Sequence, residues 1–243
     1  MTRNIIITGA NRGIGKSMVL TFASKGCNIW ACARKEDTEF ERFLADLSVE
    51  YNVWVKPVYF DLLKEKSLKE GLQIIFGDQQ PIDVLINNAG ISTVSLLGQS
   101  KIDNIRALFE VNYFSVLRTI QLVSKKMINR RTGCIINIAS LAGIEPQPGK
   151  IAYGSSKAAI IFMTKCLAKE LGPLGIRVNA IAPGPIETDM INQYNDGMLS
   201  KLVSESSLKR LGKAEEIANT AFFLASDQAS YINGEIIKVD GGR

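Results

Sequence analysis

The chain has 243 residues, a length typical of one large α/β domain, and we expect a single domain over residues 1–243. Hydrophobic residues make up 46% of it and charged residues 22%, a balance that excludes a disordered, collagen-like or disulfide-dependent chain. The sequence contains no histidine. Histidine-based nucleophilic triads and imidazole metal sites are therefore excluded, and we expect no metal. A proton transferred near neutral pH has to be carried by a carboxylate, lysine, cysteine or tyrosine.

The 29 lysines and arginines outnumber the 24 aspartates and glutamates, and the net charge of +5 permits an anionic partner. These basic residues are spread along the chain and only 7% of residues are aromatic, so we expect no nucleic acid partner. The apolar run at residues 5–7 is too short for a signal peptide, and no segment approaches the ~20 apolar residues of a membrane span. The four cysteines form no Cys-x-x-Cys pair. We therefore expect a cytoplasmic protein without a membrane partner.

Short apolar runs alternate with longer amphipathic segments, a pattern typical of βαβ units around a parallel sheet. Several runs are apolar on both faces, as in strands covered by helices on both sides. Helical periodicity is clearest from Ile14 to a stop at Gly26, over residues 102–129 and over residues 153–171. We predict an α/β fold with a Rossmann-type, doubly wound, seven-stranded parallel sheet, its strands at residues 4–8, 28–33, 53–60, 84–87, 134–139, 177–182 and 235–239.

A glycine-rich turn joins the first predicted strand to the first predicted helix. Glycines at such a turn let the backbone approach a pyrophosphate, whose charge lies at the helix N-terminus. Turns of this kind also occur for steric reasons alone, but the position at the start of the chain favours dinucleotide binding. The predicted contacts in the turn are Gly9, Asn11, Arg12, Gly13, Ile14 and Gly15.

The end of the second strand indicates which dinucleotide is bound. An acidic residue there suits the ribose of NAD, and an arginine suits the extra phosphate of NADP. The strand runs into Arg34 and Lys35, and Arg12 lies in the glycine turn, so we predict NADP(H). The alternative is that Arg34 and Lys35 are solvated loop charges. A ribose contact by Glu36 or Asp37 would contradict the prediction.

Polar residues follow the third and fourth strands, at the sheet edge where open α/β sheets bind ligands. Asp61, followed by Leu62, could accept a hydrogen bond from the adenine amino group or could cap the next helix. Asn88, within Asn87-Asn88-Ala89-Gly90, could contact the cofactor or form a turn.

The predicted acid/base chemistry lies at the fifth strand and the helix after it. Tyr153 and Lys157 are four residues apart, so a helix places them on one face. A nearby ammonium favours the phenolate and lowers the pKa of a tyrosine from about 10. Ser140, at the end of the fifth strand, could hold the reacting oxygen while Tyr153 transfers the proton. The alternative is a partly buried tyrosine beside a surface lysine.

Taken together, the motifs resemble the classical short-chain dehydrogenase/reductases over essentially all 243 residues. The resemblance implies an NADP-dependent oxidoreductase acting on CH–OH groups, usually as a homotetramer. The motifs that carry it are Thr8-Gly9-x-x-x-Gly13-x-Gly15, Asn87-Asn88-Ala89-Gly90, Asn112, Ser140, Tyr153-x-x-x-Lys157, Pro183-Gly184-x-Ile186-x-Thr188 and Gly234-x-x-x-x-Val239-Asp240-Gly241-Gly242.

The resemblance also implies a role for each matching residue. Tyr153 would be the acid/base, and Lys157 would bind the nicotinamide ribose and lower the tyrosine pKa. Ser140 would orient the substrate carbonyl, and Asn112 would anchor the water chain that returns protons through Lys157. Thr188 would hold the carboxamide. The implied cofactor contacts beyond the glycine turn and Arg34 are Asp61, Leu62, Asn88, Ala89, Gly90, Tyr153, Lys157, Pro183, Gly184, Ile186 and Thr188.

Within the family, the chain is similar to the 3-oxoacyl-(acyl-carrier-protein) reductases, which act in fatty acid biosynthesis. This implies a 3-oxoacyl thioester substrate and an acidic carrier-protein partner. Arg131 matches one docking arginine of that group, but Leu174 stands where a second is expected. The segments that carry the similarity are Ile186-Glu187-Thr188-Asp189-Met190, Arg210-Leu211-Gly212-x-x-x-Glu216-Ile217-Ala218 and Phe223-Leu224-Ala225-Ser226-Asp227.

The substrate-facing loops are expected at residues 92–101, 141–150 and 186–210. The third has the apolar residues of a mobile lid, and such lids serve many substrates. A keto-sugar, a cyclic ketone or a free alcohol therefore stays open as the substrate. A non-catalytic NADP-binding regulator is the alternative from another class, although it would need no proton relay. The lid residues are Met190, Met198, Leu199, Leu202 and Val203.

Overall fold

The computed structural model describes residues 2–189, 191 and 196–243. Its seven strands form one parallel sheet in the order β3-β2-β1-β4-β5-β6-β7, so the predicted doubly wound sheet is confirmed. Each predicted strand agrees with the observed one to within two residues at either end. The strands are β1 (Asn4–Thr8), β2 (Asn28–Ala33), β3 (Val55–Tyr59), β4 (Val84–Asn87), β5 (Gly133–Ile138), β6 (Ile176–Pro183) and β7 (Ile236–Val239).

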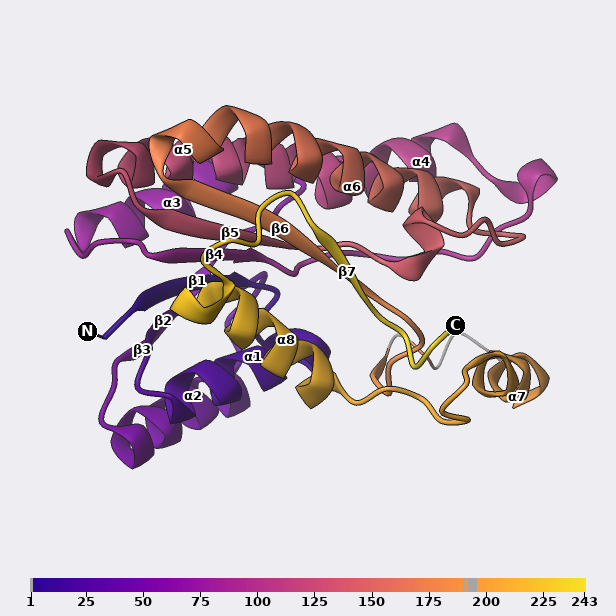
Figure 1. Cartoon of the computed structure of the whole chain (residues 1–243), viewed down its shortest axis with the longest axis horizontal. Helices are drawn as coiled ribbons and strands as arrows, with labels where there is room; N and C mark the ends of the chain where they lie inside the picture. Colours follow the sequence, from indigo (N-terminus) through magenta and orange to yellow (C-terminus); the bar gives the residue numbers. More distant parts are fainter. Residues whose placement is uncertain (1, 190, 192–195) are drawn as a thin grey trace.

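Helices cover both faces of the sheet (Figure 1). On one side lie α1 (Gly13–Ser24), α2 (Thr38–Tyr51) and α8 (Ala214–Ala225); on the other lie α3 (Glu65–Gly77), α4 (Ile102–Phe109), α5 (Ser115–Arg130) and α6 (Ile151–Leu171). Successive strand residues point to opposite faces, so β1 contributes side chains to the hydrophobic core on each face of the sheet. Ile5 and Ile7 pack in the core that includes α1 and α8, and Ile6 packs in the other with Trp30. This double burial explains the uninterrupted apolar runs of the sequence.

Strand order reverses between β1 and β4, because the chain first builds β2 and β3 outward on one side and then continues from β4 on the other. Open α/β sheets bind ligands at the carboxyl ends of the strands beside such a reversal. The predicted glycine turn follows β1 and the Asn88 segment follows β4, so both lie at this point.

The long helix predicted over residues 102–129 is interrupted. A π-helical turn, Glu110–Phe114, joins α4 to α5, and the Ser115 N–H donates to the Glu110 carbonyl five residues earlier. The wider turn directs Asn112 inward, where it is fully buried. Turns of this kind occur mostly at functional sites.

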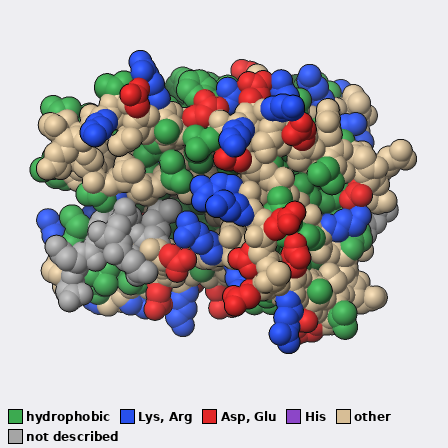
Figure 2. All heavy atoms as spheres, turned by 180° about the vertical axis from the view of Figure 1, so that it is seen from behind, with side chains coloured by type: hydrophobic (Ala, Val, Ile, Leu, Met, Phe, Trp, Pro, Cys, Tyr) green, Lys and Arg blue, Asp and Glu red, His purple; other side chains and the backbone are tan. Residues whose placement is uncertain are grey.

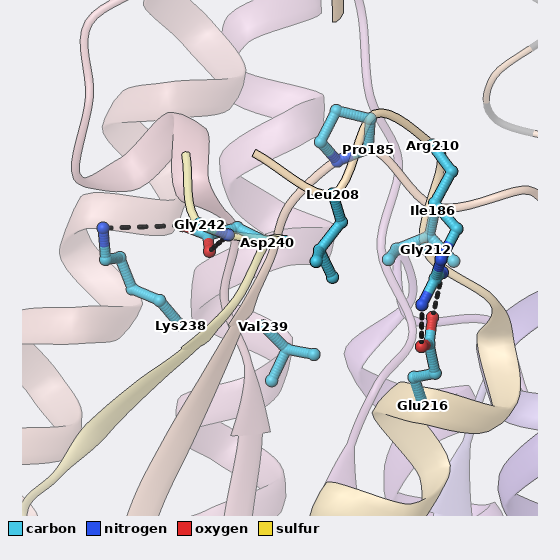
Figure 3. A pocket seen from close by; sticks show the side chains of 11 residues that line it. Pro185, Ile186, Leu208, Arg210, Gly212, Glu216, Lys238, Val239, Asp240 and Gly242 are labelled. Atoms are coloured by element: carbon cyan, nitrogen blue, oxygen red, sulfur yellow. Dashed lines mark hydrogen bonds and ion pairs between the residues drawn. The ribbon is translucent and has the colours of Figure 1, made fainter. Parts of the chain in front are cut away.

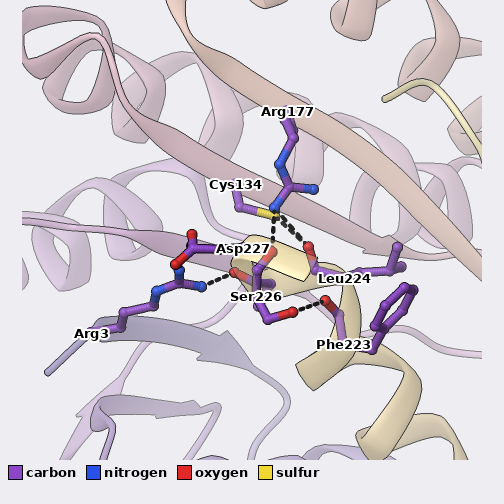
Figure 4. Close-up of polar contacts among 8 residues, drawn as sticks. Arg3, Cys134, Arg177, Phe223, Leu224, Ser226 and Asp227 are labelled. Carbon is purple, nitrogen blue, oxygen red and sulfur yellow. Dashed lines mark hydrogen bonds and ion pairs between the residues drawn. The ribbon is translucent and has the colours of Figure 1, made fainter. Parts of the chain in front are cut away.

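The helix α8 is fastened at its C-terminus by two arginines from the sheet side (Figure 4). Arg177, at the start of β6, donates to the carbonyls of Leu224 and Ser226, at 2.8 and 3.4 Å. Arg3 donates to the carbonyl of Ala225 and forms an ion pair with Asp227. Guanidinium groups here satisfy carbonyls that have no partner within the helix. None of the described helices is long and apolar enough to cross a membrane.

Candidate active site

The glycine turn forms a backbone cradle at the N-terminus of α1. Gly9 and Gly13 have φ angles of +65° and +50°, which favour glycine. A Cβ atom on Gly15 would lie 1.9 Å from the Gly9 carbonyl oxygen, and one on Gly9 would lie 2.8 Å from the Ala89 Cα. Side chains are therefore excluded where the turn, α1 and the segment after β4 meet. A pyrophosphate fits such a cradle, since backbone N–H groups of the helix end face it.

Thr8 and Asn88 lock the glycine turn to the end of β4. The Thr8 hydroxyl oxygen accepts the N–H groups of Asn88 and Ala89, at 3.0 and 3.1 Å. The Asn88 amide donates to the carbonyls of Thr8 and Gly9, both at 3.0 Å. The side chain of Asn88 therefore shapes the cradle, and its predicted role as a cofactor contact stays a prediction.

The residues predicted to choose between NAD and NADP lie beside the cradle, because Ala10 of the turn bonds to the Cys32 carbonyl of β2. Arg34 is exposed, and Arg12 lies 3.6 Å from Asp189 in an exposed ion pair. The carboxylate of Asp37 caps α2 by accepting the N–H groups of Glu39 and Phe40. The cap uses one carboxylate oxygen of Asp37 and does not involve Glu36, so the predicted choice of NADP over NAD stays a prediction.

Asp61 is held in the turn before α3. Its carboxylate accepts the Leu63 N–H at 3.0 Å, and its own N–H donates to the Ser67 hydroxyl at 3.0 Å. Asp61 therefore stabilises the turn before α3 and does not cap the helix, whose N-cap residue is Lys64. The predicted adenine contact of Asp61 stays a prediction. Leu62 is partly buried against the core below α3.

Lys157 lies on the inner side of α6, against the end of β5. Its ammonium donates to the Ile138 carbonyl at 2.7 Å, and the side chain is 5% exposed. Burial lowers the pKa of Lys157 to about 8, because the charged form loses hydration. The group therefore stays largely protonated near neutral pH while remaining close to its titration. A surface lysine, the alternative from the sequence, is wrong.

Asn112 is the centre of a small polar cluster. Its amide donates to the Ile91 carbonyl at 2.9 Å and to the Ser156 hydroxyl at 3.1 Å, and its side-chain oxygen accepts the Ile91 N–H. A Cβ atom on Gly90 would lie 3.3 Å from that oxygen and 3.5 Å from the Lys157 ammonium. Gly90 thus gives Asn112 and Lys157 a common boundary, as the predicted proton path requires.

Ser140 is brought to α6 by a pair of glycines. It caps a short 3₁₀ turn, η3 (Leu141–Gly143), by accepting the Ala142 N–H at 3.2 Å, which leaves its hydroxyl proton to be donated elsewhere. A Cβ atom on Gly143 would lie 2.7 Å from the Lys157 carbonyl carbon, and one on Gly154 would lie 2.7 Å from the Ala142 carbonyl oxygen. Only glycines allow η3 to lie this close to the helix that carries Tyr153.

Two lysines lie over the ring of Tyr153. The Lys157 ammonium is 5.9 Å from the ring centroid and the Lys150 ammonium is 5.2 Å from it. Lys150 is 5% exposed and donates to the Ser92 hydroxyl at 3.2 Å. In the sequence, Lys150 is only the last residue of the predicted substrate loop 141–150. The residue precedes α6, so helical spacing gives no signal for its contact with Tyr153.

The segment after β6 closes the site beside the glycine turn. A Cβ atom on Gly13 would lie 3.3 Å from the Thr188 methyl group, so the two predicted cofactor segments touch. Gly184 packs on the backbone of Asp240, and its N–H donates to the Val239 carbonyl. The side chain of Ile186 is buried in the core, so a cofactor contact there would involve its backbone.

The far end of the third predicted loop is fixed to α8. Arg210 forms two hydrogen bonds with Glu216, at 2.9 and 2.6 Å, on the wall of a cavity of about 250 Å³ (Figure 3). The guanidinium lowers the pKa of Glu216 to about 2. Between Thr188 and Arg210 lies a helix, α7 (Asp196–Glu205), which contains four of the five predicted lid residues. The fifth, Met190, lies outside the described residues.

The other two predicted loops lie against each other. The Ser95 N–H donates to the Gly149 carbonyl at 2.9 Å. Ser95 and Leu97 also line a cavity of about 500 Å³ together with residues 142–151. This contact brings the loop after β4 to the start of α6.

Arg131 ends α5 in a left-handed conformation and donates to the Pro173 carbonyl at 2.9 Å. The structure therefore places it beside Leu174, the position where the second docking arginine is missing from the sequence. Its role in carrier-protein docking stays a prediction.

The sheet, the cradle at the strand reversal and the polar cluster around Tyr153 define an oxidoreductase that acts on CH–OH or carbonyl groups. The chain belongs to the short-chain dehydrogenase/reductase family: the family model described as Enoyl-(Acyl carrier protein) reductase matches residues 9–243.

Relatives and solved structures agree with this assignment over the full length. The chain is 36% identical to the 3-oxoacyl-(acyl-carrier-protein) reductase FabG of Staphylococcus epidermidis, over 100% of this chain and 99% of that protein. It is 31% identical to the solved 3-oxoacyl-(acyl-carrier protein) reductase of Brucella melitensis, with a TM-score of 0.91 and coverage of 99% and 90%. The solved YwfH, an NADPH-dependent reductase involved in bacilysin biosynthesis, is 29% identical, with a TM-score of 0.93 and coverage of 100% and 98%.

Proposed function

We propose that this chain is an NADPH-dependent ketoreductase that reduces the 3-oxo group of an acyl thioester, as in fatty acid biosynthesis. The observation that carries the proposal is the placement of the buried Lys157 ammonium near the ring of Tyr153, with Asn112 behind it. A protein that only bound the dinucleotide could use Lys157 for the ribose, but it would need no proton relay through Tyr153, Lys157 and Asn112. Full-length similarity to 3-oxoacyl-(acyl-carrier-protein) reductases supports the choice of substrate.

Each polar side chain of the site has a separate role in carbonyl reduction. When bound, the nicotinamide cofactor supplies the hydride. Tyr153 donates its phenolic proton to the carbonyl oxygen, and the Ser140 hydroxyl orients that oxygen by a hydrogen bond. Lys157 stabilises the resulting phenolate. Asn112 fixes the backbone of Ile91 and the Ser156 hydroxyl beside Lys157, at the start of a path by which water returns the proton.

The preference for NADPH is supported by the cationic side chains around the cradle. Arg12 and Arg34 are exposed there, and Arg12 already has an anionic neighbour, Asp189, at 3.6 Å. A 2′-phosphate would offer Arg12 a doubly charged partner in its place. Asp37 uses one carboxylate oxygen as the cap of α2, which leaves a single oxygen of that group for a ribose.

Replacement of Tyr153 tests the proposal. We expect Tyr153→Phe to keep the affinity for NADPH, measured by fluorescence titration, and to lose turnover by about 10²–10⁴-fold, the range for removal of a general acid. The phenylalanine keeps the ring and removes only the ionisable hydroxyl. Retention of most of the turnover would contradict the assignment of Tyr153.

A substrate panel tests the second part of the proposal. NADPH oxidation is followed with acetoacetyl thioesters, with and without a carrier protein, and with cyclic ketones and keto-sugars. We expect the thioesters to give the highest kcat/KM. Activity on non-acyl substrates alone would favour the second candidate, a short-chain reductase of another ketone or alcohol, which the similarity to YwfH also supports.

The assembly and location proposed for the enzyme follow from the family. We propose a cytoplasmic homotetramer, with acyl carrier protein as a partner that docks near Arg131. The four cysteines are unpaired thiols, as a reducing compartment requires. Size-exclusion chromatography with light scattering measures the subunit number directly.

A further inference from the structure

Lys150 is a buried cation whose position is set by its neighbours on both sides. Gly149, just before it, has a φ angle of +76°, and a Cβ atom there would lie 3.0 Å from the Val94 side chain. The Gly149 carbonyl accepts the Ser95 N–H, and the Lys150 ammonium donates to the Ser92 hydroxyl at 3.2 Å. The loop after β4 therefore holds both the backbone and the amine of Lys150.

A lysine that is 95% removed from water is unusual, because long charged side chains normally extend into solvent. Here the amine extends inward and lies 5.2 Å from the centroid of the Tyr153 ring, nearer than the Lys157 amine at 5.9 Å. A positive charge within about 4–6 Å of a titratable group shifts its pKa by about 1–3 units. The 5.2 Å is the distance to the ring centroid and not to the phenolic oxygen, so the geometry places the Lys150 charge over the ring that carries the titrating hydroxyl.

We propose that Lys150 is a second positioning residue for the ionisation of Tyr153, held in place by Ser92 and acting together with Lys157. This inference rests on the proposed role of Tyr153 as the acid/base. The loop that precedes α6, residues 144–150, contains one charged residue besides Lys150. This residue is Glu145, whose carboxylate lies 4.0 Å from the Lys238 ammonium. The 3₁₀ turn η3, which packs on α6 from the other side, contains only Leu141, Ala142 and Gly143 and brings no titratable group.

The sign of the effect follows from the charge. An ammonium stabilises the phenolate, so its removal raises the pKa of Tyr153. Ketone reduction needs the protonated phenol and declines as the pH rises through that pKa, whereas alcohol oxidation needs the phenolate. Without Lys150, both pH limits that depend on Tyr153 should move to higher pH.

The test is a direct titration of the Tyr153 phenolate by ultraviolet absorbance. Each protein is compared at every pH with the same protein carrying Tyr153→Phe, so that the difference belongs to Tyr153 alone. We expect Lys150→Gln to raise the titration midpoint by about one pH unit or more, and Lys150→Arg to restore most of the shift. Ser92→Ala should give a smaller shift in the same direction, because the amine loses its anchor.

Lys126→Gln is the matched control. Its amine also lies over an aromatic ring, 5.1 Å from that of Phe76, and the change in net charge is the same. A midpoint in Lys150→Gln no higher than in Lys126→Gln would overturn the proposal. If Lys150→Gln does not fold, Ser92→Ala decides, and an unshifted midpoint overturns it.

The titration needs no turnover, so it separates the two proposals. If Tyr153→Phe retains its activity, the proposed function fails, while the phenolate midpoint still reports whether Lys150 acts on Tyr153.

Discussion

The ammonium of Lys157 is held where water cannot hydrate it, and the Ile138 carbonyl replaces only part of that hydration. In the folded chain the pKa of this group is about 8, against 10.5 for an unperturbed lysine. The folded protein therefore binds fewer protons than the unfolded chain between about pH 8 and about pH 10.5. Stability rises with pH wherever the unfolded chain binds more protons, so the cost of this buried charge is present near neutral pH and disappears above that window.

We therefore expect the free energies of unfolding of the native chain and of Lys157→Met to depend differently on pH. From pH 8 to pH 10.5, the native chain should gain about 2–3 kcal/mol relative to the variant. Urea unfolding at pH values across this window measures the difference, with both proteins carrying Tyr153→Phe so that the phenol coupled to Lys157 does not contribute. Parallel curves would show that Lys157 is not desolvated in solution.

Residue spacing alone predicts the pairing of Tyr153 with Lys157, because both lie within one helix and a four-residue interval has a fixed geometry. It does not predict Lys150, which precedes that helix with φ of −107° and ψ of 15° and is held by the separate loop that contains Ser92. Asp37 shows a related limit. A carboxylate after a strand can bind a ribose or cap a helix, and only the folded backbone distinguishes the two.

At the scale of elements, the close approach of η3 to α6 depends on two glycines. A Cβ atom on Gly143 would meet the backbone of both Lys157 and Ala158, at 2.7 and 2.8 Å. Backbone atoms cannot rotate away as a flexible side chain can, so η3 would have to move outward with Ser140 attached. Misplacement by about 1 Å can cost about 10²-fold in rate.

We expect Gly143→Ala to lower kcat with acetoacetyl thioesters by at least about tenfold. Gly77→Ala is the matched control, because a Cβ atom there meets nothing within 4 Å and the residue ends α3 away from the site. Steady-state kinetics on the two variants give the comparison. Equal activities would mean that the contact between η3 and α6 can relax without moving Ser140.

The end of α8 is a second contact between elements that can be tested. The Arg177 guanidinium donates to the carbonyls of Leu224 and Ser226 (Figure 4), and so joins β6 to the end of α8. It also donates to the Ile232 carbonyl in the turn before β7. Hydrogen bonds from a charged group contribute about 1.5–3 kcal/mol, and their loss leaves the carbonyls without a partner. Arg177→Met should therefore lower the free energy of unfolding by about 2 kcal/mol.

Arg106→Met provides the control for this change. Arg106 pairs with Asp103 one turn away on α4, and the two side chains are 76% and 90% exposed. Exposed pairs of this spacing contribute only a few tenths of a kcal/mol. Equal shifts of the urea midpoint in both variants would show that Arg177 does not stabilise the end of α8.

Element prediction succeeds where burial on both faces gives long apolar runs, as in β1 and β4. It fails at residues 110–114, where apolar residues continue from α4 into α5 with no glycine or proline to mark the interruption. A π turn adds one residue to a helical turn and leaves no local composition signal. The identity of Asn112 predicts a polar group in this helix, but not the change of hydrogen bonding that directs it inward.

At the scale of the whole molecule, the net charge is +5. On the face seen in Figure 2, lysine and arginine side chains are interspersed with aspartate and glutamate and do not form a single positive patch. Attraction of an acidic carrier protein would therefore depend on local groups such as Arg131, whose position beside Leu174 is fixed by its bond to Pro173. Interactions between exposed charges are screened as salt rises, since the Debye length falls from about 30 Å at about 0.01 M to about 3 Å at about 1 M.

We expect kcat/KM for a carrier-protein thioester to fall by about tenfold or more over that range of ionic strength, while kcat/KM for a short, uncharged thioester stays nearly constant. Arg131→Gln should flatten the salt dependence of the first substrate only. The same salt dependence for both substrates would indicate that salt acts on the enzyme itself and would remove the support for docking at Arg131.

The π turn at Glu110–Phe114 also has a consequence for how this site is gained or lost in the gene. It holds one residue more than an ordinary helical turn, so deletion of a single codon would leave α4 and α5 as one regular helix. The helix on either side would keep its orientation, because the wider turn already accommodates the extra residue. The fold would keep a helix at this place, but the amide that now holds Ile91 and Ser156 would lose its position. One in-frame deletion would therefore remove the placement of Asn112 while leaving the surrounding fold in place.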